Sequence, residues 1–257
     1  MVTNLLNNKA TKLFLILAGI FIANAVVSEI TGVKIFSLEN TLGFESLNYS
    51  IFGEQNLSFN LTAGVLPWPI IFVFTDIINE YYGVKGVKFL SYLTSGLIVF
   101  VFLILYITIQ LAPANWWVAS QAANGVPNMQ AAIHVIFGQG LFIIMGSICA
   151  FIVGQISDAF IFTKIKKITG EKNIWLRATV STLFSQLIDS YVVIIIAFYF
   201  GSNWSIVKCL AIGTNNYLYK FMVAILMTPL VYIAHYCIEK YLGKSLATSM
   251  KIDAMAG

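Results

Sequence analysis

The sequence predicts an all-α integral membrane protein with six transmembrane helices, and two observations carry that prediction. Hydrophobic residues make up 59% of the 257 residues and charged residues only 10%, whereas soluble domains average about 45–50% and about 25%. Six apolar stretches are also long enough to cross a bilayer, which takes about 20 residues of helix. This composition excludes a soluble enzyme, a disordered chain and a nucleic-acid-binding protein, so we expect a single transmembrane domain over residues 1–257.

The expected spans follow one another along the whole chain. The fourth is longer than one perpendicular crossing, which predicts a tilt or an extension beyond the membrane. The first long connection, 31–62, contains two short alternating runs, at 34–39 and 56–62, and these predict a short β-hairpin. The segment 204–209 is expected to lie in the interface between the last two spans. The spans cover about residues 12–30, 63–82, 87–111, 133–163, 174–200 and 214–239.

Basic residues lie almost entirely on one side of these spans. The other side keeps only Lys34 and Lys208, while Lys220 falls inside the sixth span. Cytoplasmic loops carry the excess of lysine and arginine in membrane proteins, so both termini are predicted to be cytoplasmic. The residues on the basic side are Lys9, Lys12, Lys85, Lys88, Lys164, Lys166, Lys167, Lys172, Arg177, Lys240, Lys244 and Lys251.

Several polar side chains fall within the expected spans, where a charge costs about 2.5 kcal/mol or more. Three of them are aspartates on three different spans, and one is a lysine. Amide and hydroxyl side chains accompany the aspartates one helical turn away, and a Gln-x-x-Asp pattern occurs on two consecutive spans. The candidate substrate-binding residues are Asn24, Asp76, Asn79, Glu80, Gln155, Asp158, Ser185, Gln186, Asp189, Asn216 and Lys220.

These polar groups have a structural interpretation as well as a functional one. Single Ser, Asn and Gln side chains often only hydrogen-bond between membrane helices, and Glu80 lies close enough to a span end to sit in the interface. Pairing Lys220 with one acid still leaves at least two carboxylates, so a solvated cavity or ligand site is the better interpretation of the set. For Lys220 and its nearest plausible counter-ion, Asp189, a structural ion pair and a role in ligand binding both stay open.

Motifs for catalysis, metal binding and nucleotide hydrolysis are absent from the sequence. There is no HExxH motif, and no histidine is placed to activate a serine. Gly243-Lys244-Ser245 resembles the end of a phosphate-binding loop but lacks its first glycine and a preceding strand. The two histidines, His134 and His235, lie at span ends and are expected in the interface. We therefore predict a protein that is not an enzyme and that holds no metal and no cofactor.

Four segments resemble the queuosine precursor transporter family, formerly called a putative vitamin uptake group. They are FTDIINEYYG, GQISDAFIFTKIK, WLRATVSTLFSQLIDSYVVIIIAF and NNYLYKFMVAILMTPLVYI, in family order and spacing over about residues 64–236. The resemblance implies a six-span protein of the bacterial inner membrane that imports 7-deazaguanine precursors of the tRNA nucleoside queuosine. It also implies binding roles for Asp76, Gln155, Asp158, Asp189 and Lys220.

The leading hypothesis is a secondary transporter or facilitator for a deazapurine base, either the cyano or aminomethyl form of 7-deazaguanine or queuine. The N1–H and 2-amino donors of such a base suit a carboxylate, and its O6 suits an amide or a lysine. Its flat ring would stack on an aromatic side chain, with Phe72, Phe184, Tyr191 and Tyr219 as candidates. The alternative is the substrate-binding membrane subunit of an energy-coupled importer, which needs a separate ATPase module. The expected partners are the small-molecule base and the lipid bilayer, and the oligomeric state stays open.

Overall fold

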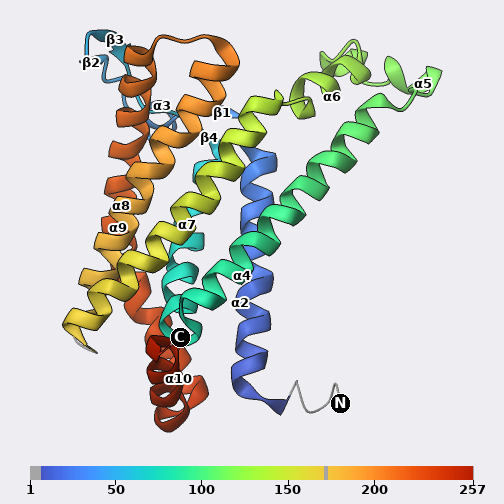
Figure 1. The fold of residues 1–257 in the computed structure, drawn as a ribbon. Helices are drawn as coiled ribbons and strands as arrows, with labels where there is room; N and C mark the ends of the chain where they lie inside the picture. The colour runs from blue at the N-terminus through green and yellow to red at the C-terminus, as the bar shows by residue number, and fades with distance from the viewer. Residues whose placement is uncertain (1–6, 171–172, 257) are drawn as a thin grey trace.

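A computed structural model of the chain describes residues 7–170 and 173–256, and long helices make up most of it (Figure 1). Within these residues, five helical stretches are long and apolar enough to cross a membrane: Lys9–Thr31, Ala63–Gln110, Met129–Thr169, Ile174–Phe200 and Ile206–Leu242. The expected all-α membrane protein is confirmed. The orientation of the termini stays a prediction, and Lys172, one of the basic residues that supports it, lies outside the described residues.

The second and third expected spans are found in one helix, α4 (Trp68–Gln110), which is interrupted at Gly83. Figure 1 shows the chain entering α4 near the strands, turning beside the C-terminal helix α10 (Lys244–Ala256) and leaving toward α5. Gly83 has φ 70° and ψ −177°, a conformation that only glycine adopts readily. Each arm of α4 therefore corresponds to one predicted span, and a count of six crossings rests on both arms traversing the bilayer.

Replacing Gly83 by Ala is expected to lower the free energy of unfolding by about 1–3 kcal/mol from backbone strain alone. A β-carbon there would also lie 2.8 Å from the carbonyl oxygen of Ala254, so α10 would have to shift. Gly96, in the same helix, is the matched control, because a β-carbon at that position meets no atom within 4 Å. Thermal unfolding in detergent should show a loss of stability for Gly83→Ala and no loss of stability for Gly96→Ala. Equal stability of the two variants would contradict a turn that requires glycine.

Other span boundaries differ from the expected ones. The expected fourth span is two helices, α6 (Met129–Phe137) and α7 (Leu141–Thr169), separated around Gly138. Helix α8 (Ile174–Ile194) continues as a π-helical segment, η3 (Ile195–Phe200). The last long helix, α9 (Ile206–Leu242), begins earlier than predicted, so the expected interfacial piece 204–209 is wrong.

The cause is a helix cap. Ser205 caps α9, and its hydroxyl accepts a hydrogen bond from the backbone N–H of Lys208 at 3.2 Å. This cap satisfies a donor in the first turn, which lets the helix start directly after the connection. The low hydropathy around Asn203 therefore marks a short loop and not a separate segment in the interface.

The connection after α2 (Lys9–Thr31) contains the predicted strand pairing. Strand β1 (Ile35–Ser37) pairs antiparallel with β4 (Asn60–Thr62), and β2 (Tyr49–Ile51) pairs with β3 (Glu54–Leu57). The connection also holds a one-turn helix, α3 (Leu38–Thr41), and it ends in the 3₁₀ turn η1 (Ala63–Val65). The remaining short elements are α5 (Asn115–Val118) and η2 (Ala122–Asn124), in the connection between α4 and α6.

The strands of this connection dock on the start of α9. The Tyr49 hydroxyl donates to the side-chain carbonyl of Asn215, and the Asn215 amide donates to the carbonyl of Ser58 at 2.9 Å. Asn215 is buried by these contacts. The β2–β3 hairpin is thereby fixed to the same end of α9 that carries Tyr219 and Lys220.

The orientation of the chain can be tested by cysteine labelling after Cys149, Cys209 and Cys237 have been replaced. Lys167 is exposed at the basic end of α7, and Ser46 is exposed in the connection that contains the strands. With cytoplasmic termini, an impermeant thiol reagent should label Ser46→Cys in intact cells and should label Lys167→Cys only after permeabilisation. The reverse pattern would overturn the predicted orientation.

Candidate functional site

A pocket lies between the first arm of α4, helix α8 and helix α9. About 530 Å³ of space around its lining residues is not filled by atoms, part of it open to the surroundings. Ligand sites in proteins are mostly apolar with a few polar groups, and the lining of this pocket has that character. Its lining residues are Val65, Trp68, Pro69, Phe72, Val73, Asp76, Ala178, Thr179, Thr182, Gln186, Tyr219, Lys220, Val223, Ala224, Met227, Thr228 and Val231.

Two polar groups of the pocket have atoms without a hydrogen-bond partner. Asp76 and Gln186 are each only 2% exposed. Among the described residues, neither Oδ1 of Asp76 nor Nε2 of Gln186 has a partner. Unsatisfied buried polar atoms are costly and call for an explanation. The pocket therefore offers a carboxylate acceptor and an amide donor to an incoming ligand.

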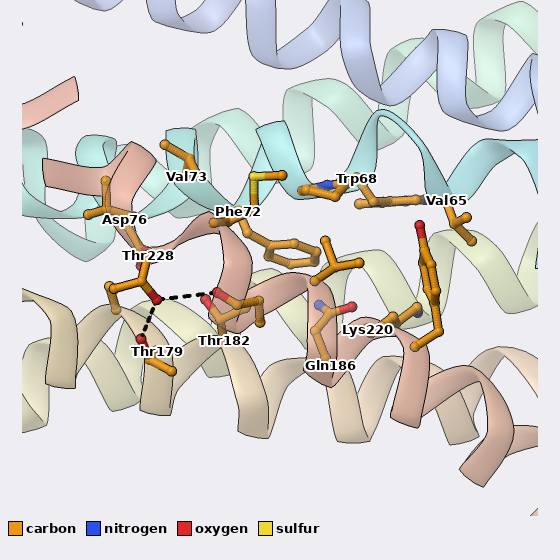
Figure 2. Close-up of a pocket in the computed structure, with 17 residues that line it drawn as sticks. Val65, Trp68, Phe72, Val73, Asp76, Thr179, Thr182, Gln186, Lys220 and Thr228 are labelled. Carbon is orange, nitrogen blue, oxygen red and sulfur yellow. Dashed lines mark hydrogen bonds between the residues drawn. The ribbon is translucent and has the colours of Figure 1, made fainter. Parts of the chain in front are cut away.

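Flat aromatic side chains form part of the pocket wall. Trp68 and Phe72 are one helical turn apart on α4, with ring centroids 5.9 Å apart and planes at 24°. Figure 2 shows them facing Thr182 and Gln186 of α8 across the pocket. Tyr219 of α9 adds a third ring. A planar heterocycle can stack on such a surface.

Two of the four aromatic residues expected to stack on a base are not at the pocket. Phe72 and Tyr219 line it, whereas the Phe184 side chain is 54% exposed. Tyr191 hydrogen-bonds Thr214 at 2.7 Å and is not among the lining residues. Trp68 was not among the candidates, although it lies one turn before Phe72 on the same face of α4.

Lys220 joins the pocket to the third aspartate. Its ammonium is ion-paired with the carboxylate of Asp189, and both side chains are 16% exposed. Lys220 lines the pocket and Asp189 does not. Glu29 of α2 accepts a hydrogen bond from the Ser147 hydroxyl of α7. The expected counter-ion of Lys220 is therefore found, and its role stays a prediction.

The double variant Asp189→Asn with Lys220→Met decides between a structural and a functional role for this pair. If Lys220 or Asp189 contacts the ligand, the double variant should be produced at native levels but should not take up the base. If the pair is purely structural, replacing only Asp189 or only Lys220 should lower the protein level, since the remaining partly buried charge loses its counter-ion. Removing both charges should then restore protein level and uptake together. Uptake at the native rate in the double variant would contradict the functional role.

The first Gln-x-x-Asp pair lies behind the pocket wall and does not line it. Asp158 of α7 is fully buried, and its Oδ1 accepts a hydrogen bond from the Ser185 hydroxyl at 3.2 Å. Gln155 accepts a hydrogen bond from Thr75 at 2.6 Å. One turn further along, Asn79 of α4 donates to the carbonyl of Ala159, the residue after Asp158. These groups form a second polar layer between α4 and α7, next to Asp76.

Four of the candidate residues lie elsewhere. Asn79 donates to the carbonyl of Ala159 at 2.9 Å, which is the helix-to-helix role considered as the alternative. Asn24 donates to the carbonyl of Ile20 within its own helix. Asn216 is half-buried but is not among the lining residues, and Glu80 belongs to a separate ionic cluster.

The ionic cluster lies one helical turn beyond Asp76 along α4. The Glu80 carboxylate contacts Arg177 of α8 at 2.8 Å and Lys166 of α7 at 3.1 Å, and all three side chains are buried. Arg177 also donates to the carbonyl of Gly170 at 2.8 Å. Glu80 is therefore buried between three helices, where two cations contact its carboxylate, and its depth in the membrane stays a prediction.

His235 is also buried and not interfacial as expected. It is 4% exposed, and its Nδ1 is 3.2 Å from the hydroxyl of Tyr81. Lys251 of α10 lies over the Tyr81 ring, 5.6 Å from its centroid, and pairs with Glu239 at 2.6 Å. Helix α10 therefore lies against Tyr81 of α4 and Glu239 of α9 through Lys251, and the sequence analysis did not predict this helix.

Three threonines of the pocket were missed by the sequence analysis. Thr179 and Thr182 lie on the α8 face that also carries Gln186, and Thr228 of α9 is 3.2 Å from the Thr179 hydroxyl (Figure 2). Positions 179, 182 and 186 are spaced so that they lie on one face of a helix. This spacing was the sequence feature that could have indicated the two α8 threonines. Hydroxyls are common in membrane helices, so spacing alone did not distinguish these from packing residues.

A helical membrane protein with an aromatic-lined pocket between its long apolar helices is the class that this fold and site define. A family model described as "Putative vitamin uptake transporter" matches residues 62–234. The chain belongs to this transporter family; it is a multi-pass membrane protein and not an enzyme.

Two curated relatives carry the name "Probable queuosine precursor transporter". One, from Bacillus subtilis (strain 168), is 29% identical over 182 residues, which cover 68% of this chain and 73% of that protein. The other, from Haemophilus influenzae (strain ATCC 51907 / DSM 11121 / KW20 / Rd), is 24% identical over 184 residues, covering 71% and 72%. No solved structure matches the chain.

Proposed function

We propose that this protein imports a 7-deazaguanine precursor of queuosine across the bacterial inner membrane as a secondary transporter or facilitator. The observation that carries the proposal is the pair of unsatisfied groups in the pocket, Oδ1 of Asp76 and Nε2 of Gln186. A guanine-type base carries the complementary set on one edge: two donors at N1–H and the 2-amino group, and an acceptor at O6. The printed names of the two relatives agree with this substrate class.

In the proposed complex, Asp76 accepts from the N1–H and 2-amino groups, and Gln186 donates to O6. The ring stacks on Phe72 or Trp68, and Tyr219 covers the opposite side. Thr179, Thr182 and Thr228 supply hydroxyls for the rest of the ring or its substituent. This arrangement gives partners to the buried Asp76 and Gln186 atoms that have none among the described residues. Such groups discriminate strongly against ligands that leave them unpaired.

A binding panel tests the substrate class. Purified protein is heated with guanine, the cyano and aminomethyl 7-deazaguanines, and queuine, with cytosine as a control. A specific base at a hundredfold excess over its Kd should stabilise the protein by about 2.7 kcal/mol. Stabilisation by none of the deazaguanines would overturn the proposal. Uptake of the stabilising base by liposomes that contain this chain alone would establish transport without an ATPase module.

A further inference from the structure

The carboxylates of Asp76 and Asp158 form a buried pair that substrate recognition does not fully use. Asp76 is 2% exposed and Asp158 is 0% exposed. In the described part of the chain, Oδ1 of Asp76 and Oδ2 of Asp158 accept no hydrogen bond. Two hydrogen bonds join α4 to α7 on either side of these aspartates, from Thr75 to Gln155 at 2.6 Å and from Asn79 to the carbonyl of Ala159 at 2.9 Å. Two acids on different helices are thus held in the same layer, each with an oxygen that has room for a proton.

The cations packed around this pair are engaged elsewhere. Arg177 and Lys166 contact the Glu80 carboxylate, at 2.8 Å and 3.1 Å. Lys220, which lines the same pocket, is paired with Asp189. On the remaining side, His235 is directed to the Tyr81 hydroxyl, 3.2 Å away. Within residues 7–170 and 173–256, neither aspartate forms an ion pair. The Ser185 hydroxyl donates to Oδ1 of Asp158 at 3.2 Å, and Oδ2 accepts no hydrogen bond.

Electrostatics then requires a proton on the pair. A buried carboxylate without a counter-ion neutralises itself by binding a proton, and two adjacent carboxylates cannot both ionise at low dielectric. The pair therefore titrates as a unit and holds one proton when it carries one charge. A metal ion is a poorer occupant, because the described residues contain no group of three or more His, Cys, Asp or Glu side chains that could hold one.

We propose that Asp76 and Asp158 share a proton that is co-transported with the base, an inference that rests on the function proposed above. The base requires Asp76 in its ionised form, since a carboxylate accepts from both of its donors. Binding therefore places the proton on Asp158, and the loaded protein carries one base and one proton. When the base leaves toward the cytoplasm, water enters the vacated site, where the low-dielectric limit on double ionisation no longer applies, and the proton on Asp158 is released into that water. The pair then takes up a proton from the outer side before it binds the next base, so one proton crosses the membrane with each base.

Transport by the native protein in liposomes tests this without any variant. The membrane potential is clamped at zero, a pH gradient of one unit is imposed with the acidic side outside, and the base identified by the binding panel is supplied. Coupling to one proton predicts about tenfold accumulation, since one pH unit is a tenfold change in equilibrium constant. A trapped pH dye should report proton influx that begins when the base is added.

The Asp158→Asn variant localises the proton. Asp158 does not line the pocket, so this variant should still equilibrate the base while losing both the accumulation and the dye signal. Asp253→Asn, at an exposed aspartate of α10, should retain both. Should Asp158→Asn fail to fold, the dye signal of the native protein still decides whether a proton moves.

The outcomes separate the two proposals. Net uptake of labelled base by native protein without proton influx, or accumulation driven only by a sodium gradient, would overturn the proton proposal and leave the substrate intact. Full coupling in Asp158→Asn would overturn the assignment to this pair. Absence of any exchange of the deazaguanine bases would overturn the proposed function, and the proton proposal with it.

Discussion

Replacing Glu80 by Gln is expected to lower the free energy of unfolding by about 3–5 kcal/mol, the largest loss of stability among the changes considered. Glu80 is the carboxylate that the buried cations Arg177 and Lys166 both contact, at 2.8 Å and 3.1 Å. Glutamine keeps the shape but removes the charge, and removing one partner of a buried ion pair is strongly destabilising. Thermal or denaturant unfolding in detergent measures the loss.

Glu239 provides the matched control for this substitution. It pairs with Lys251 at 2.6 Å, but its side chain is 43% exposed. Solvent-exposed ion pairs contribute only about 0–1 kcal/mol, so the free energy of unfolding of Glu239→Gln should be close to that of the native protein. Similar losses of stability in the two variants would show that the cluster at Glu80 is solvated and that it does not hold α4, α7 and α8 together.

Replacing Asp76 by Asn is expected to weaken binding of the deazaguanine base about ten- to hundredfold. Hydrogen bonds to a charged group contribute about 1.5–3 kcal/mol, and each 1.4 kcal/mol is a factor of ten in Kd. Asparagine fills the same volume, so folding should be retained. Equilibrium binding to native and variant protein measures the change.

A ligand analogue makes this prediction specific. A 7-deaza base without the 2-amino group cannot give its second donor to Asp76, so the native protein should bind it more weakly than the full base. The Asp76→Asn variant should show a smaller difference between the two ligands, which is a double-mutant cycle with the ligand as one partner. An unchanged difference would place the 2-amino group away from Asp76.

The sequence indicated those pocket residues that place a charged or polar side chain in an apolar span. Asp76, Gln186 and Lys220 line the pocket, and all three were candidates because polar side chains in the middle of apolar spans need a partner or a cavity. The same reasoning gave Asp189 as the counter-ion of Lys220. The positions of these residues in the pocket do not establish that they bind a ligand, and their role in binding stays a proposal.

The sequence was less informative where the outcome depends on three-dimensional packing. Glu80 looked interfacial from its position near a span end, and only the approach of Arg177 from α8 and Lys166 from α7 shows why it is buried. The two arms of α4 were expected as separate spans, but the geometry of the turn depends on Gly83 against Ala254 of α10. Contacts between segments so far apart in the chain leave no periodic signal in either segment.

A structure determined with the bound deazaguanine would show whether the pocket between α4, α8 and α9 holds the base. We expect the ring beside Phe72, its N1–H and 2-amino groups at the carboxylate of Asp76, and its O6 at the amide of Gln186. A base bound elsewhere in the protein, with Asp76 and Gln186 still lacking partners, would refute the proposed site.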